Sequence, residues 1–353
     1  MCIYLIVLIL VVALSALAEK KTNILYSIVV AIPLIIVSGI RWNVGTDFGT
    51  YYYTFNKILS FPFSILISNS YGDFIPFERG FSILVWIIGV ISKEPQVVIF
   101  FISVFNVGMV IYCLKKYSKS FTLSVYLYIT MMVYFSAFNG MRQWIASIIL
   151  FWAIKYIWND NFIKYFICVI LASTIHISAL IMIPVYFIVK ERPFGRKIFI
   201  IIILLIVVSM RLDSILDKFE NITSGTRYES YTTINNEDDG VNIFRVLVAF
   251  IPIIMSFMYY MNYKNDKKMN ILINFAMMNF LVLCLATKST YISRFSMYFE
   301  IYNLLLYPKF INGLKKGQRS LFCTLVVICF FAYMCMLLPV DSNLLPYKTI
   351  FNK

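Results

Sequence analysis

Five short stretches of this 353-residue chain place charged or titratable side chains directly beside long apolar runs. The first stretch follows the apolar run 24–40 and contains Arg41, Gly45, Asp47 and Tyr51. Gly45 permits a tight turn, the carboxylate of Asp47 can accept a proton or bind a cation, and the ring of Tyr51 can stack on a sugar. The alternative is an ordinary interfacial belt, in which Arg41 snorkels and the rings lie at headgroup level.

The second stretch is Glu78-Arg79-Gly80-Phe81, at the start of the short apolar run 79–92. Glu78 supplies a second carboxylate that can act as an acid or base together with Asp47. A charged pair at a helix end explains the same residues, and the spacing does not decide between the two interpretations.

The third stretch opens the apolar run 140–158 with Asn139, Arg142 and Gln143. Because these residues stand at i, i+3 and i+4, a helix would place them on one face. The planar guanidinium of Arg142 matches the oxygens of a phosphate. The alternative is a structural arginine paired with Asp47 or Glu78.

The fourth stretch holds His176 and Ser178 inside the apolar run 162–189, and His176 is the only histidine of the chain. Histidine is the side chain that titrates near neutral pH without help from its surroundings. His176 can therefore act as a general base or orient a phosphate; a buried structural histidine is the alternative.

The fifth stretch contains Tyr291, Arg294 and Tyr298, which the same helical spacing places on one face. An arginine flanked by tyrosines suits an anionic lipid headgroup with an attached sugar, whereas cation–π packing between helices is the alternative. In the polar stretch 211–240, Arg227 can guide an extended sugar chain, although a solvated loop explains that stretch as well.

The elements that position these residues are membrane helices. Hydrophobic residues make up 61% of the chain and charged residues only 14%, against roughly a quarter charged in soluble proteins. This excludes disordered, fibrous and disulfide-framework classes. The net charge of +14 lies in short loops between apolar runs, which is typical of cytoplasmic loops and predicts no nucleic-acid partner.

We expect an all-α polytopic membrane protein with about ten to twelve transmembrane helices. Residues 1–353 form one integral membrane domain in this interpretation, and 211–240 is its external loop. The stretch 162–189 is one long helix or two short spans that turn near His176. One of 55–67, 79–92 and 96–114 is re-entrant or interfacial. Otherwise the number of membrane crossings would not bring the basic loops before and after these segments to the same, cytoplasmic side. Further spans are expected at 1–18, 24–40, 121–138, 140–158, 197–210, 241–262, 269–286, 295–311 and 319–339.

The sequence predicts no cofactor and requires no metal. It contains no phosphate-binding loop of the GxxxxGK[ST] type and no GxGxxG motif, and its seven cysteines form no CxxC pair. On the predicted topology the arginines, His176 and the two carboxylates gather near the outer face. Such a set suits a lipid diphosphate, whose leaving charge the arginines would neutralise.

The order of these motifs resembles the EpsG family, which belongs with the Wzy-type polymerases of bacterial O-antigen, capsule and exopolysaccharide. Phe48 departs from the family pattern, which usually has a tyrosine there. The motifs that carry the resemblance are Arg41…Gly45-Thr46-Asp47…Tyr51, Glu78-x-Gly80-Phe81, Asn139-x-x-Arg142-Gln143-x-x-Ala146, His176-x-Ser178-Ala179-Leu180 and Arg294-Phe295-x-x-Tyr298-Phe299.

The resemblance implies a fold similar to the GT-C glycosyltransferases, in a multi-pass protein of the bacterial cytoplasmic membrane. It also implies an undecaprenyl-diphosphate-linked oligosaccharide as substrate, polymerised at the outer face with membrane lipids and a chain-length regulator as partners. Two alternatives stay open: a transferase that adds one sugar or modifies the polysaccharide, and a flippase or exporter of the lipid-linked unit.

The expected roles divide the candidate residues into three groups. The general base is expected among His176, Asp47 and Glu78, with His176 ranked first. Arg142 and Arg294 are expected to hold the diphosphate, with help from Arg41. The expected glycan-binding and supporting residues are Asn139, Gln143, Tyr51, Ser178, Tyr298 and Arg227.

Overall fold

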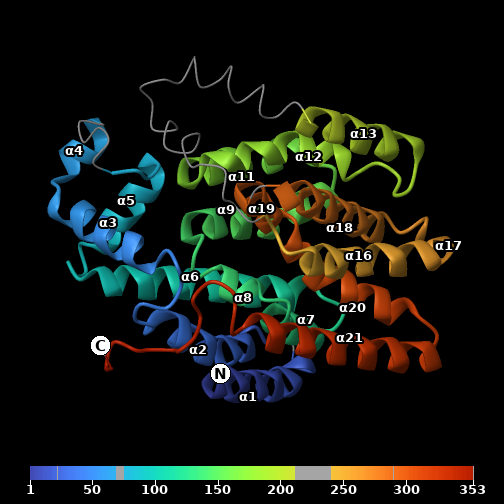
Figure 1. Ribbon diagram of the computed structural model, residues 1–353, viewed down its shortest axis with the longest axis horizontal. Helices are drawn as coiled ribbons and strands as arrows, with labels where there is room; N and C mark the ends of the chain where they lie inside the picture. The colour runs from blue at the N-terminus through green and yellow to red at the C-terminus, as the bar shows by residue number, and fades with distance from the viewer. Residues whose placement is uncertain (22, 69–74, 211–239, 289, 353) are drawn as a thin grey trace. The chain divides into compact units, whose positions relative to one another are not determined.

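The computed structural model describes residues 1–21, 23–68, 75–210, 240–288 and 290–352 (Figure 1). Across these residues the chain is helical, and the one β-type contact is an isolated antiparallel bridge between Arg41 and Thr349. The predicted loop 211–240, except Gly240, and Arg227 within it lie outside the described residues. The described chain divides into two compact units, Met1–Ile181 with Ile301–Lys353, and Met182–Glu300.

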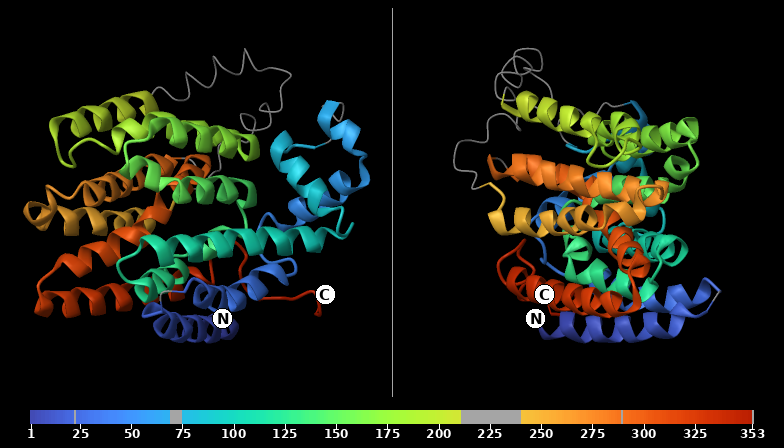
Figure 2. Two further views of the ribbon diagram at one scale, coloured as in Figure 1. Left: turned by 180° about the vertical axis from the view of Figure 1, so that it is seen from behind. Right: turned by 90° about the vertical axis from the view of Figure 1, so that its right-hand side faces the viewer.

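Long apolar helices form the body of the first unit. They are α1 (Cys2–Glu19), α6 (Pro95–Tyr117) and α21 (Lys316–Leu337), each long and apolar enough to cross a membrane. The shorter α2 (Leu25–Gly39) packs along both α1 and α6, and α1 also packs on α7 (Phe121–Thr130). Figures 1 and 2 show α1, α2 and α6 running side by side.

Three short helices follow α2 in the same unit and share an apolar core with α6 and with the later residues Met141, Ile145 and Ile175. The three helices are α3 (Phe48–Ser60), α4 (Phe63–Ser68) and α5 (Arg79–Ile88). The longest, α3, has 13 residues, which is about 20 Å of helix against a hydrocarbon core of about 30 Å. We expect one of the segments 55–67, 79–92 and 96–114 not to span the membrane. Among them, only 96–114 lies in a helix of spanning length.

Several stretches predicted as single helices are interrupted. The stretch 121–138 breaks at Met132, whose φ of 68° separates α7 from α8 (Val133–Ser136). The stretch 140–158 divides into α9 (Met141–Trp152) and α10 (Ile154–Trp158). Within 295–311 the chain passes through the 3₁₀ turn η5 (Glu300–Tyr302) into α20 (Asn303–Gly313).

The stretch 162–189 breaks at its histidine. α11 (Phe162–Ile175) ends at His176, whose backbone is extended at φ −151° and ψ 114°. The 3₁₀ helix η2 (Ile177–Ile181) and then α12 (Met182–Ile188) follow. The interruption takes the side chain of His176 out of the helical repeat of α11.

The second unit contains α12, α13 (Arg196–Met210), α16 (Ile243–Met258), α17 (Tyr260–Tyr263), α18 (Lys267–Leu285), η3 (Ala286–Lys288), α19 (Thr290–Ser293) and η4 (Arg294–Tyr298). α16 packs on α18, and α18 is long and apolar enough to cross a membrane. Asn274 of α18 donates to the carbonyls of Val189 and Glu191, at 3.0 and 2.7 Å, and so ties the end of α12 to α18. The predicted all-α polytopic membrane fold is confirmed.

Candidate functional site

Glu78 lies at the centre of a cluster of three residues that the sequence predicted as functional. Its Oε2 pairs with Nη1 of Arg142, and its Oε1 lies 2.8 Å from Nδ1 of His176. The backbone N–H of Ile177 also donates to Oε1, at 3.2 Å. The side chains of Glu78, Arg142 and His176 are 19%, 13% and 20% exposed. The cluster is therefore shielded from solvent but open to a ligand.

A glycine brings the carboxylate to the histidine. Glu78 caps the N-terminus of α5, and Gly80 stands in the first turn of that helix. A Cβ atom on Gly80 would lie 2.5 Å from the carbonyl oxygen of Thr174, closer than real side chains approach. Because Gly80 has no side chain, the start of α5 can touch the last turn of α11, which ends at His176.

The surroundings of Glu78 keep its carboxylate ionised. Burial alone would raise the pKa of Glu78. The hydrogen bond from His176 and the positive charge of Arg142 lower it by more than burial raises it, so the pKa is about 2. An ionised carboxylate only accepts hydrogen bonds, so Nδ1 of His176 is the donor in their contact. Nε2 of His176 makes no hydrogen bond to the residues that the structure describes. In this contact Nδ1 carries the proton, so the lone pair of a neutral ring lies at Nε2.

Arg142 is held by the residues that precede α5. Its guanidinium lies 4.3 Å from the ring centroid of Phe77, and Nη1 is also 3.4 Å from the carbonyl oxygen of Pro76. Of the two interpretations of Arg142, the structure shows the pairing with Glu78. This pairing does not exclude a diphosphate, because a guanidinium has five N–H donors. The sequence analysis did not find Phe77, although its position next to Glu78 was the available signal.

Tyr51 and Asp47 lie in the electrostatic surroundings of Arg142. The side chain of Tyr51 is buried, and its ring packs 5.4 Å from that of Phe77. Burial raises the pKa of Tyr51, the charge of Arg142 lowers it, and that of Asp47 raises it, with a net increase. Asp47 is half-buried at the N-terminus of α3. The candidate residues from the first three stretches are thus neighbours.

The predicted common face of Asn139, Arg142 and Gln143 is wrong for Asn139. α9 begins at Met141, so Asn139 lies before the helix and outside its repeat. Its Oδ1 accepts instead from the backbone N–H of Asp47, at 3.4 Å. Gln143 is buried inside α9. Asn139 therefore supports the turn that carries Asp47.

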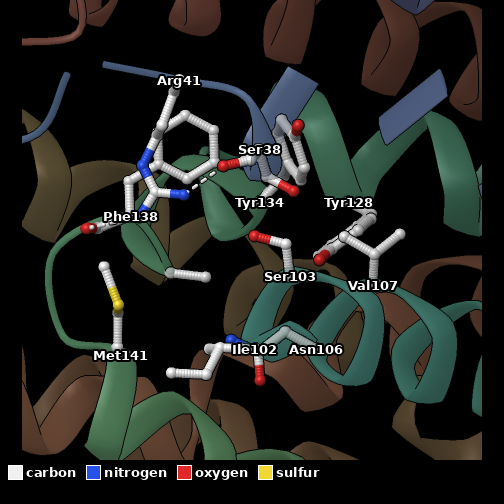
Figure 3. A pocket seen from close by; sticks show the side chains of 11 residues that line it. Ser38, Arg41, Ile102, Ser103, Asn106, Val107, Tyr128, Tyr134, Phe138 and Met141 are labelled. Carbon is white, nitrogen blue, oxygen red and sulfur yellow. Dashed lines mark hydrogen bonds between the residues drawn. The ribbon is translucent and has the colours of Figure 1, made fainter. Parts of the chain in front are cut away.

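Arg41 points into the protein. It is 2% exposed, donates from Nη1 to the carbonyl of Ser38 and from Nη2 to that of Phe138 at 3.3 Å, and stacks 4.4 Å from the Phe138 ring centroid. Figure 3 shows the guanidinium beside that ring, at the edge of a small cavity. The other side chains that line the cavity belong to Ser38, Ile102, Ser103, Asn106, Val107, Tyr128, Tyr134, Ala137 and Met141.

Three predicted site residues remain to be placed. Ser178 is half-buried in η2, two residues after His176. Arg294 and Tyr298 belong to the second unit, where η4 follows a 3₁₀ path. Residues four apart do not align in a helix with three residues per turn. Accordingly Arg294 is exposed while Tyr298 is 1% exposed, so the expectation that they share a face is wrong.

No group of three or more His, Cys, Asp or Glu side chains that could hold a metal ion is found within the described part of the chain. The cluster around Glu78 combines one carboxylate with the guanidinium of Arg142 and the imidazole of His176. Such a donor set suits proton transfer and anion binding better than metal coordination.

The sequence model of the EpsG family matches residues 23–349 of the chain. No curated protein and no solved structure matches it.

Proposed function

Because the chain belongs to the EpsG family, a membrane protein family related to exopolysaccharide, we propose that it is a polysaccharide polymerase. It would transfer a glycan chain from undecaprenyl diphosphate to the next lipid-linked repeat unit, at the outer face of the bacterial cytoplasmic membrane. The observation that supports this proposal best is the bridge that Glu78 makes between His176 and Arg142. Through Glu78, a residue that could act as a base, His176, and a residue that could bind an anion, Arg142, lie together where both are partly shielded from solvent.

In this mechanism His176 is the general base. Glu78 accepts from Nδ1 and so fixes the tautomer that presents a lone pair at Nε2. A hydroxyl of the acceptor sugar gives its proton to Nε2 while its oxygen attacks the anomeric carbon of the donor. The bond from that carbon to the diphosphate oxygen breaks, and the diphosphate leaves with the electron pair. The proton on Nε2 then passes to the diphosphate or to water.

Arg142 would neutralise the charge that develops on the leaving diphosphate. Its position is fixed by Glu78 and by the ring of Phe77, so little reorganisation is needed when the charge appears. Arg294, an exposed arginine of the second unit, stays a candidate for diphosphate binding on the strength of the family motif alone. The energy for transfer comes from breaking the bond between the anomeric carbon of the donor and its diphosphate, so no nucleotide is required.

The placement of the candidate residues favours a transferase over a carrier. Asp47, Glu78, Arg142 and His176 all stand at or within one turn of a helix end. A flippase should instead present polar groups along a path through the membrane. Labelling of cysteines placed at these positions tests the distinction, because labelling from the outer side alone fits a transferase and labelling from both sides fits a carrier.

The decisive experiment is deletion of the gene in the native host, with the surface polysaccharide separated on a gel. Complementation uses the wild type and Arg142→Ala. We expect the ladder to collapse to a single repeat, and to return with the wild type but not with the variant. Complete loss of surface polysaccharide would favour a flippase, and an unchanged ladder would favour an enzyme that modifies the polymer.

A further inference from the structure

The guanidinium of Arg41 is buried, and within the described part of the chain its Nη atoms bond to main-chain carbonyls while its Nε has no hydrogen-bond partner. It contacts the carbonyls of Ser38 and Phe138 and the ring of Phe138, and none of the ion pairs among the described residues includes it. Carbonyl dipoles thus take the place of a counter-charge. Arg41 joins the end of α2 to the residues just before α9, which are 97 positions away in sequence.

The backbone around Arg41 pairs with the C-terminal segment 343–350. The N–H of Trp42 donates to the carbonyl of Lys348 at 2.9 Å, and the N–H of Ile350 donates to that of Ile40 at 3.0 Å. The N–H of Gly45 donates to the carbonyl of Asn343 at 3.1 Å. These bonds hold both ends of the turn that leads to Asp47.

The C-terminal segment is itself fixed to the first two helices. The hydroxyl of Tyr347 donates to the carbonyl of Val37 in α2, at 2.9 Å. The hydroxyl of Tyr4 in α1 donates to the carbonyl of Leu344, at 3.0 Å, and Leu344 is 1% exposed. The segment is thus a packed element of the first unit and not a loose end.

The turn that is held in this way lies against the start of α9. Gly45 adopts a φ of +100°, and a Cβ there would lie 2.7 Å from Oδ1 of Asn139. The same Oδ1 accepts from the N–H of Asp47. Arg41 therefore donates to the carbonyl of Phe138, and the turn contacts the side chain of Asn139. These two adjacent residues immediately precede α9, the helix that carries Arg142.

We infer that Arg41 and the segment 343–350 form a clamp that positions Asp47 against the start of α9. Arg41 then serves the reaction as a positioning residue, whereas the family motif suggested contact with the diphosphate. The kinetic part of this inference rests on the proposed polymerase function, but the clamp itself is a property of the fold. It can therefore be tested without substrate.

The test measures how well the turn is held. Thr46 is exposed in the middle of the turn, so Thr46→Cys reports its opening through the rate of reaction with a water-soluble maleimide. The parent protein without this substitution gives the background from the native thiols. Arg41→Lys keeps the charge but loses the planar fork that reaches two carbonyls. Arg319→Lys is the matched control, because Arg319 also donates to a main-chain carbonyl, that of Asn312, but is exposed on α21.

Combined with Thr46→Cys, we expect Arg41→Lys to raise the labelling rate of the introduced thiol by about tenfold, as for the loss of a charge-assisted hydrogen bond, and Arg319→Lys to leave it unchanged. Tyr347→Phe removes one anchoring hydroxyl and should give a smaller increase. It decides the question if Arg41→Lys does not fold. Unchanged labelling in Tyr347→Phe and in any folded Arg41→Lys protein would overturn the clamp.

Kinetics with lipid-diphosphate-linked repeat unit then separates the two roles of Arg41. A positioning residue predicts that Arg41→Lys lowers kcat by about 10- to 100-fold with little change in KM. Increased KM with unchanged kcat and unchanged labelling of the introduced thiol would assign Arg41 to the diphosphate and overturn the inference. If no polymerisation occurs with the wild type, the polymerase proposal fails, while the labelling result still decides the clamp.

Discussion

Oε1 of Glu78 accepts a hydrogen bond from Nδ1 of His176 at 2.8 Å, while Oε2 of the same carboxylate pairs with Arg142. One side chain therefore orients the only histidine and fixes an arginine at the same time. Three helices, α5, α9 and α11, meet through it. The consequences of this shared carboxylate can be measured separately.

Replacing Glu78 by glutamine should abolish most of the polymerisation while the protein still folds. Glutamine keeps the shape but not the charge, so it no longer selects the tautomer of His176 or pairs with Arg142. We expect the rate to fall by about 100-fold or more, because His176 then loses the partner that orients it as the general base and general-base catalysis contributes in this range. The measurement is polymer length over time in isolated membranes. Glu94→Gln is the control, because the carboxylate of Glu94 accepts an exposed hydrogen bond from Tyr52. Equal losses in both variants would contradict the assignment.

Replacing His176 separates base catalysis from structural support. His176→Gln can still donate to Glu78 but cannot take a proton at neutral pH. We expect at least about a 100-fold lower rate, with the melting temperature of the purified protein close to that of the wild type. Full activity in His176→Gln would leave Asp47 as the best remaining base.

The residue types in the site were predictable, but their contacts were not. The sequence identified Glu78, Arg142 and His176 because placing an ionisable side chain in or beside a membrane segment costs free energy, so such residues usually have a functional role. It left open whether Arg142 pairs with Asp47 or with Glu78, since that choice depends on how α5 and α9 pack. Asn139 was misplaced because a helical repeat was assumed across a turn that precedes the helix.

The fold shows the same limit. The apolar runs predicted an all-helical membrane protein correctly, because burial of a helical backbone in lipid requires only local hydrogen bonds. The interruption at Met132 was not specified by hydropathy, whereas a turn near His176 was one of the two alternatives that the sequence left open. The contact of segment 343–350 with the turn at Arg41 joins residues about 300 positions apart, and no local pattern reports such a pairing.

The stability of the protein should depend on Glu78 at acid pH. Its pKa is about 2 in the folded protein and is lower than the ordinary value of 4.5. The ionised carboxylate therefore stabilises the folded state above about pH 4.5, and this contribution is lost as pH falls from 4.5 towards 2. We expect the melting temperature of the wild type to exceed that of Glu78→Gln at pH 6, and the difference to shrink below pH 4.5. A difference that does not depend on pH would show that the charge of Glu78 contributes nothing to folding.

The contact between α5 and α11 should tolerate no side chain at residue 80. In Gly80→Ala the new Cβ would lie 2.5 Å from the carbonyl oxygen of Thr174, so α5 must move away from α11. We expect this strain to lower the free energy of unfolding by about 1–3 kcal/mol and to lengthen the contact between Glu78 and His176, with a loss of activity larger than the loss of folded protein. Gly108→Ala on α6 is the matched control, because apart from the neighbouring backbone of α6 no described atom lies within 4 Å of a Cβ placed there. Thermal unfolding and polymer length, measured on both variants, check the two effects. If Gly80→Ala matches Gly108→Ala in both measurements, the close approach of α5 to α11 is not what brings the carboxylate to the histidine.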